Sequence, residues 1–363
     1  MMTGMTRLLD AEASARLDWV DVAKGICILL VVMMHATLGT GAAMGGEGFL
    51  HTAVAFAKPF RIPDFFLLSG LFLGRVIDRD WRLFADRRVV HFAYFYLLWV
   101  VIQSLAKYAQ IVEGAGPGAF LAHLATALVE PYSALWFIYL LAVFSVMTKL
   151  LRRVPGPLLL VGAMLLQTVP VPTTSLLAEE FYARYVWFVA GYLFADRIFA
   201  FAGLVRHHSI PALAGLSLWA VINGALALTP SGFASFPTLA SVPVVSMVLG
   251  GAGALAVVAV ACLLTRVNGF LTDALRRCGE RSIVIYLAFF LPMAVTRTVL
   301  VKTGVIPDVG WASLVVMLAA VAMPLVLERV VRHTPLAFLF RRPRVFHLMG
   351  RSPTSSASVP QGA

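Results

Sequence analysis

The first apolar stretch of the chain, VDVAKGICILLVVMMHATL, contains three ionisable residues, Asp21, Lys24 and His35. Lys24 and His35 are eleven positions apart, so on a helix they share one face and lie roughly 16 Å apart along the axis. A neutral imidazole costs less to bury than a fixed charge and can accept a proton near neutral pH. The spacing thus fits a surface cation and a deep base. The alternative, equally open here, is that Lys24 reaches lipid headgroups and His35 bonds a neighbouring helix.

The second apolar stretch, AKPFRIPDFFLLSGLFLG, places Arg61 and Asp64 three residues apart at its outer end. Residues at this spacing can pair on a helix surface. Such a pair near the depth of His35 predicts a polar pocket reached from outside; a purely structural ion pair is the alternative. Ser69 and Gly70 follow, and we interpret them as a close helix contact rather than a nucleophile, because small residues line membrane helix interfaces.

A basic cluster precedes the third apolar stretch. Arg87 and Arg88 end this cluster, which also contains Arg75, Arg79 and Arg82. Guanidinium groups bind phosphate well, so the cluster could hold the phosphates of a cytoplasmic donor. A basic cytoplasmic loop also explains most of these arginines.

Aromatic residues near predicted outer ends have two interpretations. Trp136, shortly after Glu130, suits an aromatic belt at the membrane surface, or a platform on which a sugar ring stacks. The belt is the simpler explanation. Tyr182 and Trp187 present the same alternatives.

The composition indicates that membrane helices position these residues. The 363-residue chain is 60% hydrophobic and 13% charged, with a mean hydropathy of +0.87. Soluble domains carry about 25% charged residues. Apolar runs of this length need lipid or another helix on every side, which excludes a water-soluble fold. We therefore predict an all-α polytopic transmembrane helix bundle of about ten spans.

Charge distribution fixes the predicted orientation. The segments on one side carry twenty-two lysines and arginines, and those on the other carry one, Lys302. This asymmetry places both termini in the cytoplasm of a multi-pass inner-membrane protein and argues against a nucleic-acid partner, despite the net charge of +11. The predicted spans are 22–42, 55–74, 89–110, 131–148, 156–172, 178–196, 210–229, 240–264, 282–301 and 311–328.

The predicted domain organisation has one integral part. A cytoplasmic segment, 1–18, precedes a transmembrane domain, 19–335, and a basic and then disordered cytoplasmic tail, 336–363, follows. No cleavable signal peptide is expected. Cys27 and Cys262 fall inside spans and Cys278 in a cytoplasmic loop, so we expect no disulfide and no metal site.

These segments together resemble the family-3 membrane O-acyltransferases, in particular the branch that looks like fucose 4-O-acetylases. The resemblance rests on DVAKGICILLVVMMH and FRIPDFFLLSGLFLG, and more weakly on FADRRVVHFAYFYLLW, ALWFIYLLAVF, YVWFVAGYLFADR and GERSIVIYLAFF. It implies transfer of an acyl group, usually acetyl, from cytoplasmic acetyl-CoA as co-substrate, with no bound cofactor, to a hydroxyl of an extracytoplasmic glycan.

The family's functional pair, a basic residue eleven positions before a histidine, falls on Lys24 and His35, with Lys where Arg is commoner. Its basic pair entering the third span falls on Arg87 and Arg88, although an Arg-x-Arg spacing is usual there. Asp64 replaces an apolar residue, which suggests a particular acceptor pocket. Phe289 and Phe290 stand where many members have a histidine, so that histidine's role is absent.

The resulting hypothesis is an acyltransferase in which Lys24, Arg87 and Arg88 bind the donor, His35 is the base, and Arg61, Asp64 and Trp136 contact the acceptor. Its partners are acyl-CoA, a glycan and membrane lipids; a homo-oligomer stays open. A glycan or solute transporter or flippase that uses the same buried charges is the competing class, and a scaffold in polysaccharide export is a third.

Overall fold

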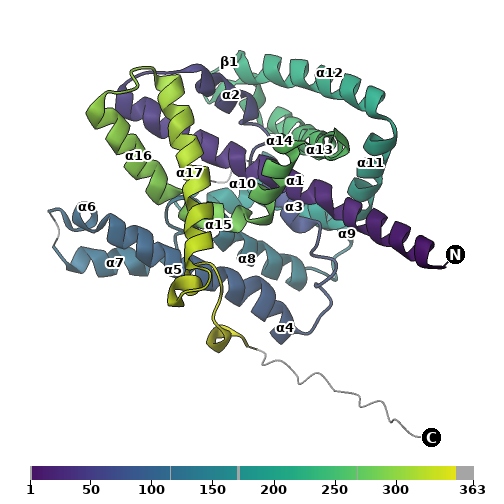
Figure 1. The fold of residues 1–363 in the computed structure, drawn as a ribbon, viewed down its shortest axis with the longest axis horizontal. Coiled ribbons are helices and arrows are strands. Elements are labelled where there is room, and N and C mark those ends of the chain that lie inside the picture. The colour runs from purple at the N-terminus through teal and green to yellow at the C-terminus, as the bar shows by residue number, and fades with distance from the viewer. Residues whose placement is uncertain (1, 115, 170–171, 268, 349–363) are drawn as a thin grey trace, which may run out of the picture.

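The computed structural model describes residues 2–114, 116–169, 172–267 and 269–348, and the fold is built around its first helix (Figure 1). Helix α1 runs without interruption from Met2 to Met44 and crosses the molecule. Its apolar part, Asp18–Met44, has the length and composition of a membrane span. Lys24 and His35 therefore belong to one continuous helix, as predicted.

Six helical segments of the described chain are long and apolar enough to cross a membrane, or eight if each of two bent pairs is one span. The six are Asp18–Met44, Trp81–Ala106, Ser133–Leu150, α12 (Ser209–Leu228), α13 (Pro243–Val267) and α17 (Val309–Val331). The bent pairs are α10 (Leu176–Leu193) with α11 (Ala195–His207), at 74°, and α15 (Ser282–Ala288) with α16 (Phe290–Thr303), at 53°. The all-α membrane bundle is supported, and the count of ten spans stays a prediction.

The expected second span, 55–74, is not one continuous helix. Helix α2 (Phe49–Ala57) ends before a turn at 58–62, α3 (Pro63–Gly70) follows, and turns continue to 79. Pro59 and Pro63 explain the break, because proline has no amide hydrogen to donate and clashes with the preceding turn. Helix α9 (Gly156–Thr168), within the expected span 156–172, has 13 residues and is also short for a span.

Glycines allow two close helix contacts. A Cβ atom at Gly70 of α3 would lie 2.2 Å from the carbonyl oxygen of Phe188, and one at Gly191 of α10 would lie 2.1 Å from that of Leu67. The backbones of α3 and α10 therefore touch, and the interpretation of Gly70 as a packing residue is confirmed.

The second glycine contact corrects the sequence analysis. The predicted cytoplasmic loop 265–281 contains helix α14 (Phe270–Glu280), in which Cys278 is buried. Its buried residues, Thr272, Leu275, Cys278 and Gly279, recur at helical spacing, a short amphipathic pattern that the sequence analysis overlooked. A Cβ at Gly279 would lie 1.7 Å from the carbonyl oxygen of Asp21, so α14 packs directly on α1.

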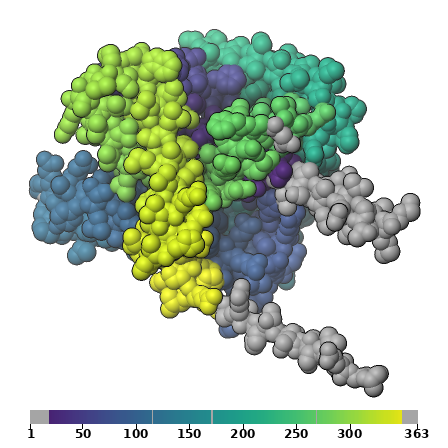
Figure 2. Space-filling model, viewed as in Figure 1, coloured from purple at the N-terminus to yellow at the C-terminus, as the bar shows by residue number. Residues whose placement is uncertain are grey.

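The C-terminal segment is folded as far as residue 348, which covers the first part of the predicted basic and then disordered tail, 336–363. It contains the 3₁₀ turns η4 (Pro335–Leu339) and η5 (Arg344–Phe346). Tyr94 and Trp99 donate hydrogen bonds to the carbonyl oxygens of Phe338 and Leu339. Figure 2 shows this segment, in yellow, lying against the blue elements that include α5. Residues 349–363, on which the rest of the prediction falls, lie outside the described residues.

A buried ion pair holds this segment in place. The guanidinium of Arg342, whose side chain is 5% exposed, lies 2.9 Å from the carboxylate of Asp86 and donates to the Asp86 carbonyl oxygen at 2.7 Å. The Leu348 amide donates to the same carboxylate at 2.8 Å. Asp86 begins a π-helical turn, η1 (Asp86–Val90), between α4 (Trp81–Ala85) and α5 (His91–Ala106). Arg342 thus pairs with protein rather than with lipid headgroups.

The remaining elements complete the bundle and one small hairpin. They are α6 (Tyr108–Val112), α7 (Gly118–Ala127), η2 (Ser133–Leu135), α8 (Trp136–Leu150), β1 (Pro230–Phe233), β2 (Phe236–Thr238) and η3 (Leu239–Ser241). Strands β1 and β2 pair antiparallel.

We predict that Gly279→Ala separates α14 from α1. The added methyl group would meet backbone rather than a flexible side chain, and overpacking of this kind costs about 1–3 kcal/mol. The melting temperature of the detergent-solubilised protein should fall. Gly215→Ala is the matched control, because nothing lies within 4 Å of the position of that Cβ. Equal melting temperatures for the two variants would contradict this packing.

We also predict that Arg342→Ala lowers the melting temperature strongly, because removal of one partner of a buried ion pair costs about 3–5 kcal/mol. Arg344→Ala removes an exposed arginine of the same segment and should have little effect. The double variant Asp86→Leu/Arg342→Leu should recover part of the loss, since no charge is then left unpaired. A double variant that is less stable than Arg342→Ala would argue against the pair.

Candidate active site

Lys24 and Arg88 line the same cavity. This cavity, of about 270 Å³, lies between α1, α3, α5, α8 and α15. The Lys24 ammonium is 3.4 Å from the Asp21 carboxylate, and Arg88 donates to the carbonyl oxygen of Phe72 at 3.4 Å. Both side chains keep further donors free for a ligand. Two cations from distant parts of the sequence therefore meet at one cavity mouth.

The walls of this cavity are mostly aromatic, with the hydroxyl groups of two serines. The aromatic side chains are Phe65, Phe72, Phe92, Phe137 and Tyr286, and the hydroxyl groups belong to Ser69 and Ser282. Phe65 stacks on Phe137 with the ring centroids 4.5 Å apart. Ser69 donates to the carbonyl oxygen of Phe65 at 2.7 Å, which satisfies its hydroxyl within α3. The cavity thus has a cationic mouth and an apolar interior, which suits a ligand with a phosphate head and a slender uncharged arm.

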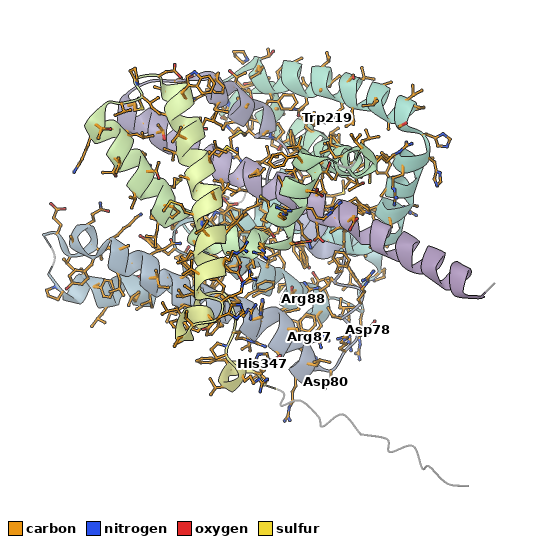
Figure 3. The ribbon with its side chains drawn as sticks, in the orientation of Figure 1. Asp78, Asp80, Arg87, Arg88, Trp219 and His347 are labelled. Carbon is orange, nitrogen blue, oxygen red and sulfur yellow. The ribbon has the colours of Figure 1, made fainter. Side chains whose placement is uncertain are left out.

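Arg87 does not join Lys24 and Arg88. Its side chain is exposed and is not among the residues that line this cavity. Figure 3 shows Arg87 and Arg88 as neighbours on η1. The π-helical turn changes the direction of successive side chains, and such turns are common at functional sites. Of the predicted basic pair, only Arg88 reaches the cavity.

His35 lies past the cavity on α1 and is half-buried. Its ring packs against Phe289, with centroids 5.4 Å apart, and Phe289 stands at the bend between α15 and α16. The ring centroid of Phe289 in turn lies 6.5 Å from that of Tyr286, a residue that lines the cavity. Two aromatic contacts therefore connect the cavity wall with His35. Phe289, where the resemblance leads one to expect a histidine, serves as a packing partner of His35.

Arg61 and Asp64 do not form the predicted ion pair. Asp64 is fully buried, and its carboxylate lies beside the Cys27 thiol and the Phe65 amide, neither of which makes a hydrogen bond of ordinary geometry to it. Arg61 lies in the turn before α3, and its buried Nε and Nη1 atoms also lack partners there. The turn at 58–62 replaces the helix on which the two would have faced each other. The positive charge of Arg61 instead acts on both His35 and Asp64.

Such unsatisfied groups are expensive. A buried polar atom without a hydrogen bond costs about 1–3 kcal/mol, and more when it is charged. A bound polar molecule would supply the missing bonds. Arg61, whose charge acts on His35, and Asp64, which lies beside Cys27 about two turns earlier on α1, therefore retain hydrogen-bonding capacity.

Trp136 and Glu130 both make contacts within the protein. Trp136 is half-buried at the start of α8, and its ring lies 6.1 Å from that of Phe66. Glu130 accepts a hydrogen bond from the Leu177 amide at 3.2 Å. Its hydrogen bonds with Ser175 and with the amides of Leu176 and Leu177 hold the pKa of the Glu130 carboxyl below its usual value. Glu130 therefore anchors the start of α10.

The sequence analysis missed two cations that matter for this architecture. Lys149 is buried and donates to the carbonyl oxygens of Ile77 at 2.6 Å and Arg79 at 2.7 Å, which fixes the segment after α3. Arg297 lies within α16, inside the predicted span 282–301. A lone arginine within an apolar run was the available signal. Among the described residues, no group of His, Cys, Asp and Glu is arranged to hold a metal ion.

Comparison with known proteins identifies the family of this chain. Residues 17–329 match the acyltransferase domain of the acyltransferase 3 family. Inner membrane protein YcfT of Escherichia coli (strain K12) is 28% identical over 170 residues, which are 39% of this chain and 45% of that protein. The chain thus matches less than half the length of this relative. No solved structure matches this chain. Since the domain match covers most of the chain, including every predicted site residue, the protein belongs to the acyltransferase 3 family.

Proposed function

We propose that this protein is an O-acyltransferase of the cell inner membrane. It would move an acyl group, acetyl in the simplest case, from cytoplasmic acyl-CoA to a hydroxyl of an extracytoplasmic or lipid-linked glycan. The observation that carries the proposal is the position of His35 three helical turns beyond a cavity whose mouth holds Lys24 and Arg88. A donor whose phosphates bind Lys24 and Arg88 would extend its thioester along α1 toward His35.

The donor would bind through its phosphates. Coenzyme A combines a charged nucleotide with a slender, uncharged pantetheine arm, and the cavity combines a cationic mouth with an apolar interior. Lys24 and Arg88 would contact the phosphates, and the arm would run between Phe65, Phe137 and Tyr286. The thioester would then lie on the His35 side of the cavity, where movement of Tyr286 or Phe289 would join the two.

The chemical step requires a base for the acceptor hydroxyl. The hydroxyl oxygen attacks the thioester carbonyl carbon and its proton passes to the His35 ring, while the carbon–sulfur bond breaks. The imidazolium then returns that proton to the departing thiolate, which gives an ester and free CoA. In a two-step form, the His35 nitrogen takes the acyl group first and passes it to the hydroxyl. Both forms consume one acyl-CoA and release one CoA.

The acceptor would occupy the other side of His35. Arg61, whose charge acts on His35, can donate to sugar hydroxyl groups, and Asp64, which lies beside Cys27 toward the donor cavity, can accept from one. Trp136 offers an aromatic edge for a sugar ring. A transporter or flippase could use the same buried charges but would release no CoA.

His35→Ala should lower the rate of CoA release from acetyl-CoA and a mixed glycan acceptor by about 10²–10⁴-fold, because general-base catalysis contributes that much. Free thiol can be measured with a chromogenic reagent, and glycan acylation by mass spectrometry. His207→Ala, at an exposed histidine on α11, is the control and should keep wild-type activity. Activity of His35→Ala within a few-fold of wild type, or glycan transport without CoA release, would overturn the proposal.

Lys24→Gln and Arg88→Gln should each raise KM for acetyl-CoA by about 10–100-fold, since hydrogen bonds to charged groups contribute about 1.5–3 kcal/mol. Acetylpantetheine is the informative second donor, because it carries the thioester without phosphates. Its KM should be almost unchanged in both variants. Arg87→Gln, at the exposed neighbour, is the matched control. Equal losses with both donors would show that these residues do not bind phosphate.

A further inference from the structure

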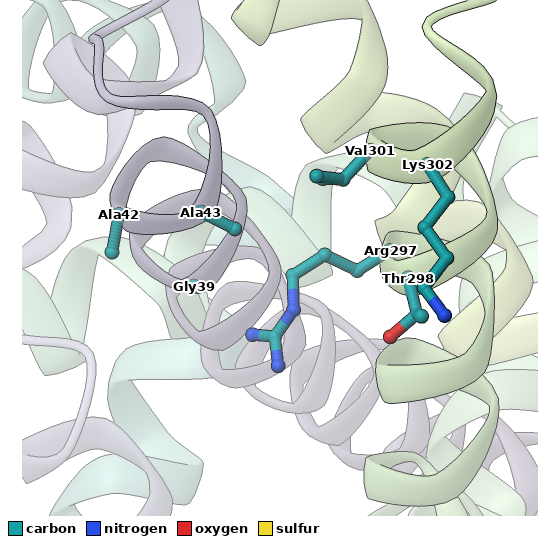
Figure 4. Close-up of a pocket in the computed structure, with 7 residues that line it drawn as sticks. All are labelled: Gly39, Ala42, Ala43, Arg297, Thr298, Val301 and Lys302. Atoms are coloured by element: carbon teal, nitrogen blue, oxygen red, sulfur yellow. The ribbon is translucent and has the colours of Figure 1, made fainter.

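A second cavity lies beyond His35, at the end of α1 opposite Lys24. It has a volume of about 530 Å³ and is formed by α1 and α16 (Figure 4). The residues that line it are Gly39, Ala42, Ala43, Arg297, Thr298, Val301 and Lys302. Small residues of α1 form one wall, and two cations of α16 lie in the other.

Arg297 reaches across this cavity to α1. Its guanidinium points at Gly39, where an added Cβ would lie 2.4 Å from Nη1 (Figure 4). Arg297 is half-buried and forms no ion pair or hydrogen bond with any residue in the described part of the chain. Its guanidinium nitrogens are accessible from the cavity, so the donors of this always-charged group are open to a ligand.

Two further cations stand near Arg297 without acidic partners. Lys302 is exposed at the end of α16. Lys107 lies over the ring of Phe290 at 4.5 Å, and its positive charge and that of Arg297 act on each other. Within the described ranges, neither lysine pairs with a carboxylate. Asp308, the nearest acid along the chain, caps α17 through the Trp311 amide.

This surplus of positive charge lies at the end of the bundle where the sequence predicts few cations. Mutual repulsion of the three cations is unfavourable, and an anion bound among them reduces it. The small side chains of α1 leave room for such a group.

The cavity is in register with His35. Gly39 and Ala42 follow His35 by four and seven residues, so they lie on the same face of α1, about 6 and 10 Å further along the axis. A sugar ring spans about this distance. A molecule anchored at Arg297 could therefore present a hydroxyl to His35.

We propose that this cavity binds an anionic oxygen group of the acceptor, a phosphate or a carboxylate, and thereby positions the acceptor hydroxyl at His35. Arg297 is the principal anchor, and Lys302 and Lys107 add to the field. The inference rests on the proposed function and extends it to the substrate class: an acidic glycan or a glycan carried on a phosphate.

Binding tests this inference without catalysis. The purified protein in phosphatidylcholine nanodiscs would be titrated with glucose 1-phosphate, methyl glucuronide and the neutral methyl glucoside, and binding followed by thermal shift. Wild type and His35→Ala should bind at least one anionic sugar and bind methyl glucoside at least tenfold more weakly. Arg297→Gln should weaken anion binding by about 10–100-fold, and Arg297→Lys by less. Arg329→Gln, which removes an exposed arginine at the other end of α17, is the control for net charge.

Other outcomes would overturn the inference. Undiminished anion binding by Arg297→Gln would do so, and so would stabilisation by phosphatidylglycerol when both anionic sugars fail, which would identify the cavity as a lipid headgroup site. If Arg297→Gln does not fold, the exposed Lys302→Gln decides, and an unchanged affinity would count against the site. Loss of CoA release in every assay with intact, Arg297-dependent anion binding would overturn the proposed function and leave the site in place.

Discussion

The distance between Lys24 and His35 is set by the backbone hydrogen bonds of one uninterrupted helix. Each residue of α1 adds about 1.5 Å, so the separation between a surface cation and a deep imidazole cannot change without breaking the helix. The neighbouring elements maintain this geometry. Helix α14 packs on α1 near Lys24 through a glycine contact, and Phe289 contacts His35 from the bend between α15 and α16. The cavity at Lys24 and the cavity at Arg297 thus lie at two places along one rigid element.

Two polar side chains beside α1, Arg61 near His35 and Asp64 near Cys27, lack the partners that a stable core would give them. Asp64 and Arg61 are close enough for their charges to interact, yet they do not bond to each other. In apolar surroundings this arrangement destabilises the folded protein, so the bundle must compensate through packing elsewhere, as between α3 and α10. Their hydrogen-bonding capacity consequently remains open to a substrate. This trade of stability for polarity is common at functional sites.

Predictions from the sequence were most accurate where helical periodicity alone determines the position of a residue. The face shared by Lys24 and His35 and the packing role of Gly70 follow from helix geometry and residue size, and both are confirmed. The break at Pro59 and Pro63 was overlooked because hydropathy averaged over a span hides a local loss of hydrogen bonds. Because Arg61 lies in a turn and not in a helix, its three-residue separation from Asp64 does not bring the two side chains together as a pair. Arg88 lines the same cavity as Lys24, and Arg87 does not, because of a π-helical turn. No residue type in the sequence predicts such a turn.

The ion pair between Asp86 and Arg342 links the beginning of α5 with almost the last described residues of the chain. During synthesis, the segment that carries Asp86 leaves the ribosome more than two hundred residues before its counterion exists. Arg88 lies two residues from Asp86, in the same π-helical turn, so this wall of the cavity has its final support only after Arg342 has been synthesised. A truncated or stalled chain would insert its early helices but lack that support. Folding of the turn around Arg88 is thereby coupled to the synthesis of the segment that contains Arg342.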